Sequence, residues 1–327
     1  DTLWASEVYE GVLRALDVSD KQNITSYGSV ETPNKFCHNV WLSDDNKYAF
    51  TTDERRGAFV GAYDVSDPSD MQELDKYQPD YGDSVVPHNT FYIDGYLVTS
   101  YYSDGVTIVD AHRPNNLVQV GYFDTSPFNG EEGGFGGCWG VYPYFPSGRV
   151  IATDRQEGLF VLNPQYKRAC YLEGNITSSE TSTPLPATNI EIIGNSFTEQ
   201  SRIDGNYYTG IADSGIYDIR FTHAQCSEMI KYDVELKHGQ VTQLDVIMNC
   251  GNVSVEEIAY KNSLLFLPHK SKRYSLSLFN LNAQLIRKWG LNPGSHTLNW
   301  DRSLPLGIYI LKIQSKDLCR SIKLINH

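Results

Sequence analysis

The 327-residue sequence predicts an all-β fold, in which repeated four-stranded sheets come first and two smaller β domains follow. Short runs of aromatic and β-branched residues alternate with turns rich in glycine, asparagine and aspartate, which is typical of strands. No long segment has the 3.6-residue periodicity of an amphipathic helix. No apolar run approaches the roughly 18 residues of a membrane-spanning helix. A repeat in the first half of the sequence predicts how the strands are arranged in that half.

The first 168 residues contain three series of similar segments. One series reads ALDVSD, AYDVSDP, TIVDAHRP and LFVLNP, and its anchors are 47, 46 and 53 residues apart: Asp17, Asp64, Asp110 and Asn163. A second reads CHNVWLSDD, PHNTFYIDG and CWGVYPYFPSG, with intervals of 50 and 51 between His38, His88 and Trp139. A third reads YAFTTDERRG, YLVTSYYSDG and VIATDRQEG.

Each repeat divides into four short strands, as in HNVWLS, KYAFTTD, GAFVGAYDVS and MQELDKYQ. A four-stranded unit of about 40–50 residues is typical of a propeller blade, whose faces are buried by neighbouring blades. Residues 1–168 are therefore predicted to be the C-terminal blades of a partial β-propeller. About three complete blades are too few to close a ring, so we expect upstream blades in the same parent protein.

The segments HNVWLSDDNKYAFTTDE, PHNTFYIDGYLVTSYYSDGVTIVD and GGCWGVYPYFPSGRVIATDRQEGLFVL resemble the LVIVD-repeat, choice-of-anchor B family of bacterial extracellular propellers. The resemblance covers about the first 168 residues. It implies LVIVD-type blades and a location outside the cell.

Residues 169–250 resemble the carboxypeptidase-regulatory-like fold, a small β-sandwich that serves as a spacer or contact domain. The resemblance rests on GNIT at Gly174, PLPATNIEI at Pro184, GIYDIRF at Gly215 and an alternating last strand over Thr242–Met248. It implies no peptidase activity. The fold class predicted for the whole chain is thus all-β, a partial β-propeller followed by two small Ig-like β-sandwich domains.

Residues 251–327 resemble the type A C-terminal sorting domain of the type IX secretion system of Bacteroidetes. The resemblance rests on SLSLFNLNAQLI, LPLGIYILKI and RSIKLI, which contain the motif residues Leu304, Gly307, Ile308, Tyr309 and Lys323. The usual PNP opening is replaced by LPHKSKR at Leu267. The resemblance implies export through the periplasm and the outer membrane, with the secretion translocon and sorting machinery as partners.

Charge separates this last segment from the rest of the chain. The net charge is −13 in residues 1–168, −7 in 169–250 and +7 in 251–327. A change of sign at a boundary indicates a domain with a different partner. The acidic bulk argues against a nucleic-acid partner, because nucleic acids bind basic surfaces.

Six cysteines are present, and none forms a CxxC pair that would indicate a zinc site. Cys170, Cys226 and Cys250 fall in one predicted domain, so a disulfide among them is one interpretation. Buried free thiols are the other.

Candidate site residues come from the repeat. If the first strand of each blade lines the central channel, then His38, His88 and Trp139 point toward the axis, together with Asn39 and Asn89. The residues after the second strand take equivalent rim positions: Asp53, Glu54, Tyr101 and Asp154. Two imidazoles among carboxylates suit a divalent cation, and the carboxylates alone would suit calcium. The competing interpretation is a structural His–Asp hydrogen-bond network within the blades.

No GxSxG, HExxH or GxxxxGK[ST] motif occurs. The sequence therefore favours a non-enzymatic binding protein, secreted or held at the cell surface. The alternative is an extracellular metal-dependent hydrolase or lyase with its site at the channel rim. A third interpretation is that the chain is cargo captured on the secretion machinery.

Overall fold

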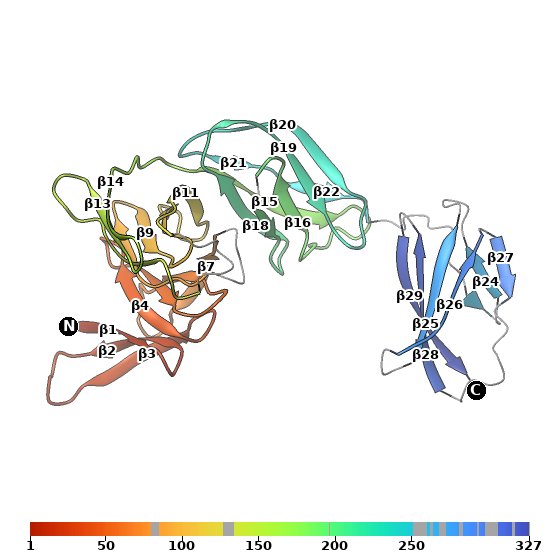
Figure 1. The fold of residues 1–327 in the computed structure, drawn as a ribbon, viewed down its shortest axis with the longest axis horizontal. Coiled ribbons are helices and arrows are strands. Elements are labelled where there is room, and N and C mark those ends of the chain that lie inside the picture. The colour runs from red at the N-terminus through yellow and green to blue at the C-terminus, as the bar shows by residue number, and fades with distance from the viewer. Residues whose placement is uncertain are drawn as a thin grey trace. The chain divides into compact units, whose positions relative to one another are not determined.

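The computed structural model describes residues 1–79, 85–126, 134–195 and 197–250, and beyond them 260–261, 264–267, 273–280, 284–292, 294–297, 307–315 and 318–326. Every regular element in these residues is a β-strand, so the prediction of an all-β fold is confirmed (Figure 1). Within the described residues no helix is long and apolar enough to span a membrane. The chain divides into two compact units, Asp1–Asn249 and Cys250–His327.

Four antiparallel sheets make up the first part of the N-terminal unit, and within each sheet the strands follow one another in chain order. The two middle sheets have four strands, and the first and last have three. The first sheet comprises β1 (Thr2–Glu7), β2 (Val12–Asp17) and β3 (Thr25–Glu31). The second comprises β4 (Cys37–Leu42), β5 (Tyr48–Asp53), β6 (Val60–Asp64) and β7 (Gln72–Tyr77). The third comprises β8 (Thr90–Ile93), β9 (Tyr96–Ser100), β10 (Val106–Asp110) and β11 (Val118–Phe123). The fourth comprises β12 (Cys138–Tyr142), β13 (Val150–Asp154) and β14 (Gly158–Leu162).

Alternation along each strand packs these sheets face to face. Because successive side chains point to opposite faces, Ala49 packs against the first sheet while Phe50 packs against the third. In the third sheet Leu97 faces the second sheet and Val98 faces the fourth. Each boundary between sheets thus has its own apolar core.

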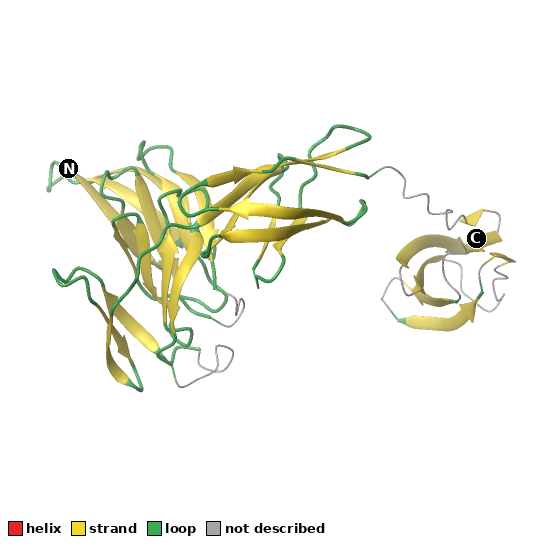
Figure 2. Cartoon of the chain, turned by 90° about the horizontal axis from the view of Figure 1, so that it is seen from above, coloured by secondary structure: helices red, strands yellow, loops and turns green. Residues whose placement is uncertain are grey.

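Two further sheets, referred to as the second pair of sheets, follow the stack of four in the same unit. One has the order β18–β15–β21, with β22 also paired to β15, and the other has the order β17–β16–β19–β20. The rings of Tyr207 and Phe221 meet edge to face, with centroids 5.8 Å apart, so the two sheets share a core. The described elements are strands joined by loops and turns (Figure 2). The strands are β15 (Cys170–Ser178), β16 (Asn189–Ile192), β17 (Thr198–Gln200), β18 (Asn206–Ile211), β19 (Gly215–Thr222), β20 (Met229–Leu236), β21 (Val241–Gln243) and β22 (Val246–Met248).

The single strand expected over Thr242–Met248 is interrupted in the structure. β21 and β22 both pair with β15 in parallel, but the chain leaves the ladder between them. There the Leu244 amide donates to the Glu173 carbonyl, and the Tyr207 hydroxyl donates to the Leu244 carbonyl. A Cβ at Gly174 would lie 2.1 Å from that carbonyl oxygen. Because Gly174 has no Cβ, the two backbones can cross at this short distance.

Two buried carboxylates hold the four-sheet stack to the second pair of sheets. Glu173 accepts hydrogen bonds from both Arg113 nitrogens Nε and Nη2 at 2.8 Å and from Asn116 Nδ2 at 3.0 Å. Asp110, a repeat anchor, accepts the backbone N–H of Ala169 at 2.7 Å. Charge-assisted hydrogen bonds of this kind are stronger than neutral ones, so the two parts are firmly joined.

The C-terminal unit is also built from strands. Its two sheets have the orders β23–β24–β27 and β26–β25–β28–β29. The alternate residues Tyr309, Leu311 and Ile313 are buried, as expected of a strand with one face in the core. The strands are β23 (Tyr260–Lys261), β24 (Leu264–Leu267), β25 (Tyr274–Asn280), β26 (Leu285–Leu291), β27 (Gly294–Thr297), β28 (Gly307–Ser315) and β29 (Leu318–Asn326).

Among the three cysteines considered for a disulfide, Cys226 and Cys250 are disulfide-bonded. Cys170 is a free thiol, and so are Cys37 and Cys138. All three free thiols are buried, and burial raises the pKa of Cys37 and Cys138 to about 12. They therefore behave as small apolar core residues.

Candidate metal centre

Three rings from successive repeats form a continuous stack in the N-terminal unit. His38 is the extra residue of a bulge in β4, between Cys37 and Asn39, and His88 lies just before β8. Their ring centroids are 4.7 Å apart, and the Trp139 ring of β12 lies 4.9 Å from His88 on the other side. His88, the middle ring, is 5% exposed, whereas Trp139 is 51% exposed and the His38 side chain is 28% exposed, so the most buried ring lies between the other two.

Backbone hydrogen bonding fixes the tautomer of His38. The His88 carbonyl accepts the Thr52 hydroxyl at 2.6 Å and lies 3.1 Å from His38 Nδ1. A carbonyl can only accept, so His38 Nδ1 carries the proton and donates it. In neutral His38, Nε2 then carries a free lone pair. Many metal-binding histidines are arranged in this way, with one ring nitrogen donating to a carbonyl and the other facing the metal.

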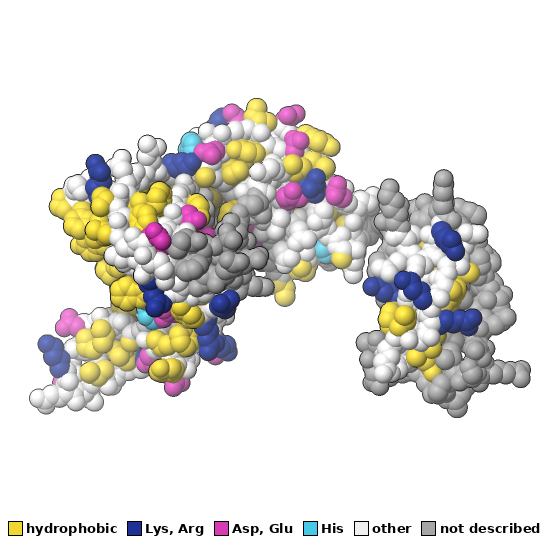
Figure 3. All heavy atoms as spheres, viewed as in Figure 1, with side chains coloured by type: hydrophobic (Ala, Val, Ile, Leu, Met, Phe, Trp, Pro, Cys, Tyr) yellow, Lys and Arg dark blue, Asp and Glu magenta, His cyan; other side chains and the backbone are white. Residues whose placement is uncertain are grey.

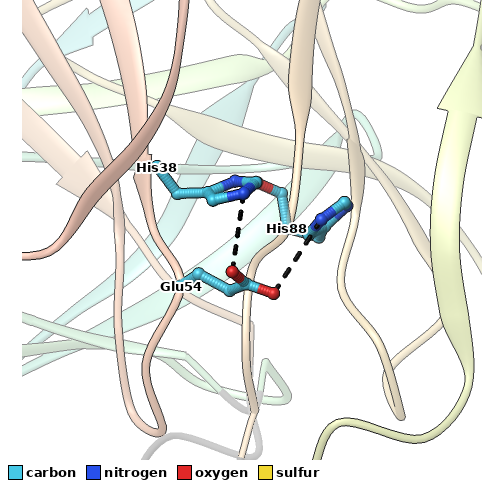
Figure 4. A group of neighbouring side chains, drawn as sticks. All are labelled: His38, Glu54 and His88. Carbon is cyan, nitrogen blue, oxygen red and sulfur yellow. Dashed lines mark hydrogen bonds and ion pairs between the residues drawn. The ribbon is translucent and has the colours of Figure 1, made fainter. Parts of the chain in front are cut away.

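Glu54, directly after β5, lies against both histidines (Figure 4). Its Oε2 is 3.5 Å from His38 Nε2, and its Oε1 is 3.8 Å from His88 Nε2. Taking one ligand atom from each residue, His38, Glu54 and His88 bring three such atoms within 4.8 Å of one another. Side-chain exposure is only 28%, 18% and 6% for His38, Glu54 and His88, so the group is largely shielded from water.

The spacing of these atoms fits a metal ion better than a hydrogen bond. Hydrogen bonds between nitrogen and oxygen measure about 2.7–3.2 Å. Zinc bonds to imidazole and carboxylate measure about 2.0–2.1 Å, so two ligand atoms of a tetrahedral ion lie about 3.3–3.4 Å apart. The separation of 3.5 Å between Glu54 Oε2 and His38 Nε2 is within about 0.2 Å of that value. The separation of 3.8 Å from His88 Nε2 involves the other carboxylate oxygen, Oε1.

Electrostatics favours the neutral ligand form of His88. Burial, followed by the neighbouring His38, lowers the pKa of His88, while Glu54 acts in the opposite direction. A metal binds the unprotonated imidazole, so a lowered pKa favours the form of His88 that can serve as a ligand.

Tyr102 was not among the residues predicted from the sequence. Its hydroxyl donates to Glu54 Oε1 at 2.6 Å, and its ring meets His88 edge to face at 5.5 Å. Burial and the bond to Glu54 raise the pKa of Tyr102, so it stays a donor. The signal was available in the third series of the repeat, where Tyr102 occupies the position of Glu54.

The structure places Tyr101, the predicted rim residue, in the apolar core. It is 0% exposed and packs with Phe50, Val60 and Leu97. Its hydroxyl lies 3.4 Å from the carbonyl oxygens of Ala58 and Tyr77. It therefore lies apart from the metal centre.

Asp53 and Asp154 are occupied by hydrogen bonds to the loops beside them. Asp53 accepts the Thr32 hydroxyl and the backbone N–H of Asn34 and Phe36 at 2.5–3.0 Å. Asp154 accepts the Thr125 hydroxyl and two backbone amides at 2.8–3.0 Å. In the described residues these two carboxylates do not join a metal-ligand cluster, which removes the oxygen-rich set that calcium would need.

Asn39 and Asn89 also make structural contacts. The Asn39 side-chain oxygen accepts the Thr90 amide at 2.9 Å and so links β4 to β8. The Asn89 backbone exchanges hydrogen bonds with Ser100. These contacts align the strands that carry the two histidines.

Of the predicted sorting motif, Gly307, Ile308 and Tyr309 lie on β28 and Lys323 on β29. Tyr309 is buried at 5% exposure. Leu304 lies outside the described residues.

No family model matches the sequence, and no curated protein matches it. Among solved structures, a protein from Lactobacillus plantarum is similar at 13% identity and a TM-score of 0.38, over 90% of this chain and 83% of that one. The periplasmic gluconolactonase of Pseudomonas aeruginosa is similar at 11% identity and a TM-score of 0.39, over 99% and 96%. Similarities this slight carry no argument, so the metal centre rests on its own geometry.

Proposed function

We propose that the protein is an exported binding protein that holds a divalent transition metal at His38, Glu54 and His88. The observation that carries the proposal is the convergence of two imidazole nitrogens and one carboxylate within 4.8 Å. Two nitrogens and one oxygen suit zinc or a similar metal rather than calcium. Three protein ligands leave a fourth position, through which a partner or small molecule could bind.

Metal titration tests this function directly. Calorimetry with Zn²⁺ or Co²⁺ is expected to show one site per wild-type chain. His38→Ala, His88→Ala and Glu54→Gln should each weaken binding by more than about 100-fold, because even outer-shell partners are worth about 10–100-fold. His238→Ala is the matched control, since His238 is exposed and bonds only to Arg168 and Cys170. Absence of binding, or equal loss in the control, would refute the proposal.

A metal-dependent hydrolase or lyase is the second candidate, because the same open position could activate water. Turnover of ester and phosphoester substrates by the zinc-loaded chain, abolished in Glu54→Gln, would favour it. Metal binding without turnover would favour the binding protein.

The four stacked sheets support the proposal that residues 1–168 are blades of a larger β-propeller. At the boundary between the second and third sheets Val60 is 0% exposed, and at the boundary between the third and fourth sheets the equivalent Val106 is 2% exposed. The third equivalent, Leu159 of β14, is 64% exposed, and its neighbour Val161 is 60% exposed. Hydrophobic side chains gather over β13 and β14 (Figure 3). By the logic of the repeat, a further blade covers this face.

Chemical accessibility tests the further blade. A cysteine introduced as Leu159→Cys should react freely with a maleimide in the 327-residue chain, where the native free thiols are buried. In the full-length parent protein the same position should react at least about tenfold more slowly. Equal reaction rates would show that no further blade covers this face.

We also propose that residues 251–327 are a type IX sorting domain and that the protein reaches the cell surface or the medium. The separate compact unit and its +7 charge support this. Fusion of residues 250–327 to a periplasmic reporter should export the reporter in a type IX-competent bacterium but not in a translocon mutant. Deletion of β29 is the control expected to abolish export. Retention of the intact fusion in the periplasm would refute the assignment.

A further inference from the structure

We propose that Tyr102 is a positioning residue of the metal centre, which holds Glu54 Oε1 so that Oε2 is the oxygen offered to the metal. This inference rests on the proposed metal-binding function. The Tyr102 hydroxyl donates to Oε1 at 2.6 Å, and this oxygen is 3.8 Å from His88 Nε2. Oε2 has the shorter separation from an imidazole nitrogen, 3.5 Å from His38 Nε2. The two oxygens of one carboxylate are thereby given different tasks.

The repeat explains how Tyr102 reaches this carboxylate. Glu54, Tyr102 and Arg155 occupy the same position in three successive repeats, directly after Asp53, Tyr101 and Asp154. In the same three repeats, the ring positions hold His38, His88 and Trp139. Acceptor and donor therefore meet across one sheet boundary because each repeat delivers a side chain to the same place.

The Tyr102 backbone is held in a conformation that a tyrosine rarely adopts. Its φ angle is +33°, in the region that disfavours residues with a Cβ. The Tyr102 carbonyl accepts the Cys138 amide at 2.7 Å and the Gly105 amide at 3.0 Å, which ties the turn to β12. Strain retained in this way clusters at functional sites.

Contacts on all sides fix the Tyr102 ring. It is 3% exposed and meets His88 edge to face at 5.5 Å and Phe135 edge to face at 5.4 Å. The hydroxyl therefore has one direction, toward Glu54. Metal ligands are generally oriented by outer-shell partners of this kind, whose loss costs about 10–100-fold in metal affinity.

The substitution Tyr102→Phe removes the hydroxyl and keeps the ring. We expect Co²⁺ affinity to fall by about 10–100-fold, with a changed visible absorption spectrum, because the freed carboxylate can rotate or bind through both oxygens. Tyr144→Phe is the matched control, since its hydroxyl donates to the Tyr92 carbonyl at 2.5 Å on another part of the sheets. Its affinity and cobalt spectrum should equal those of wild type.

Two results would overturn the inference while leaving the metal centre intact. One is wild-type affinity and spectrum in Tyr102→Phe. The other is a tyrosinate-to-Cu²⁺ charge-transfer band in wild type that Tyr102→Phe abolishes, because Tyr102 would then be a ligand itself. Absence of metal binding in wild type would instead overturn the proposed function and this inference together.

Discussion

Replacement of Glu173 by glutamine should weaken the join between the four-sheet stack and the second pair of sheets. Glu173 has a side-chain exposure of 10% and binds Arg113 through two 2.8 Å hydrogen bonds. Removal of one partner from a buried ion pair costs about 3–5 kcal/mol, because the other charge stays buried. The Arg113 side chain is 34% exposed and recovers some solvation. We therefore expect a loss near the lower limit, about 3 kcal/mol.

Urea unfolding followed by circular dichroism measures this loss as a shift of the midpoint at constant slope. Glu191→Gln is the matched control: Glu191 pairs with Arg220 at 2.7 Å in the same pair of sheets, but the two side chains are 31% and 35% exposed. Such exposed pairs contribute about 0–1 kcal/mol. If Glu173→Gln costs no more than Glu191→Gln, the buried ion pair does not hold the two parts together.

Three further predictions concern pH and tight backbone contacts. Burial raises the pKa of Asp75 to about 7, so the folded chain binds a proton that the unfolded chain releases at lower pH. Stability should therefore fall by up to about 1.4 kcal/mol per pH unit between about pH 4 and 7, relative to Asp75→Asn; parallel profiles would contradict this. Gly105→Ala should lower the melting temperature, because φ is +73° and a Cβ would lie 2.3 Å from the Phe123 carbonyl oxygen. Gly174→Ala should also lower the melting temperature. A wild-type melting temperature in either variant would refute the close backbone contact inferred at that glycine.

Much of the fold could be predicted because local signals agree with one another. The four strands expected between residues 37 and 78 are present as β4–β7, with turn residues between them. Asn46 takes a positive φ of 56° at the first of these turns. The interruption between β21 and β22 could not be predicted from the alternation of Leu244, Val246 and Met248. It depends on a crossing with β15, more than 60 residues earlier in the chain.

The candidate site was predicted only in part, because adjacent residues of the chain point in different directions and the sequence does not show which of them faces the site. Asp53 and Glu54 are adjacent, so their side chains leave the chain in different directions. Asp53 accepts the amides of the loop before β4, and Glu54 turns to the histidines. Both are carboxylates at the start of the same turn, and composition does not distinguish them. The same step separates Tyr101, which packs in the apolar core, from Tyr102, whose hydroxyl donates to Glu54.

The repeat creates equivalent positions at every sheet boundary, but the side chains at those positions decide which boundary can bind a metal. Between the second and third sheets the positions hold His38, His88, Glu54 and Tyr102, which supply two nitrogens, a carboxylate and its hydrogen-bond donor. At the next boundary Trp139 replaces the second histidine, and Tyr102 takes the place of the carboxylate. Because the ligands come from both sheets, a bound metal would link them and stabilise their packing by mass action. Metal affinity and the stability of this one boundary should therefore be coupled.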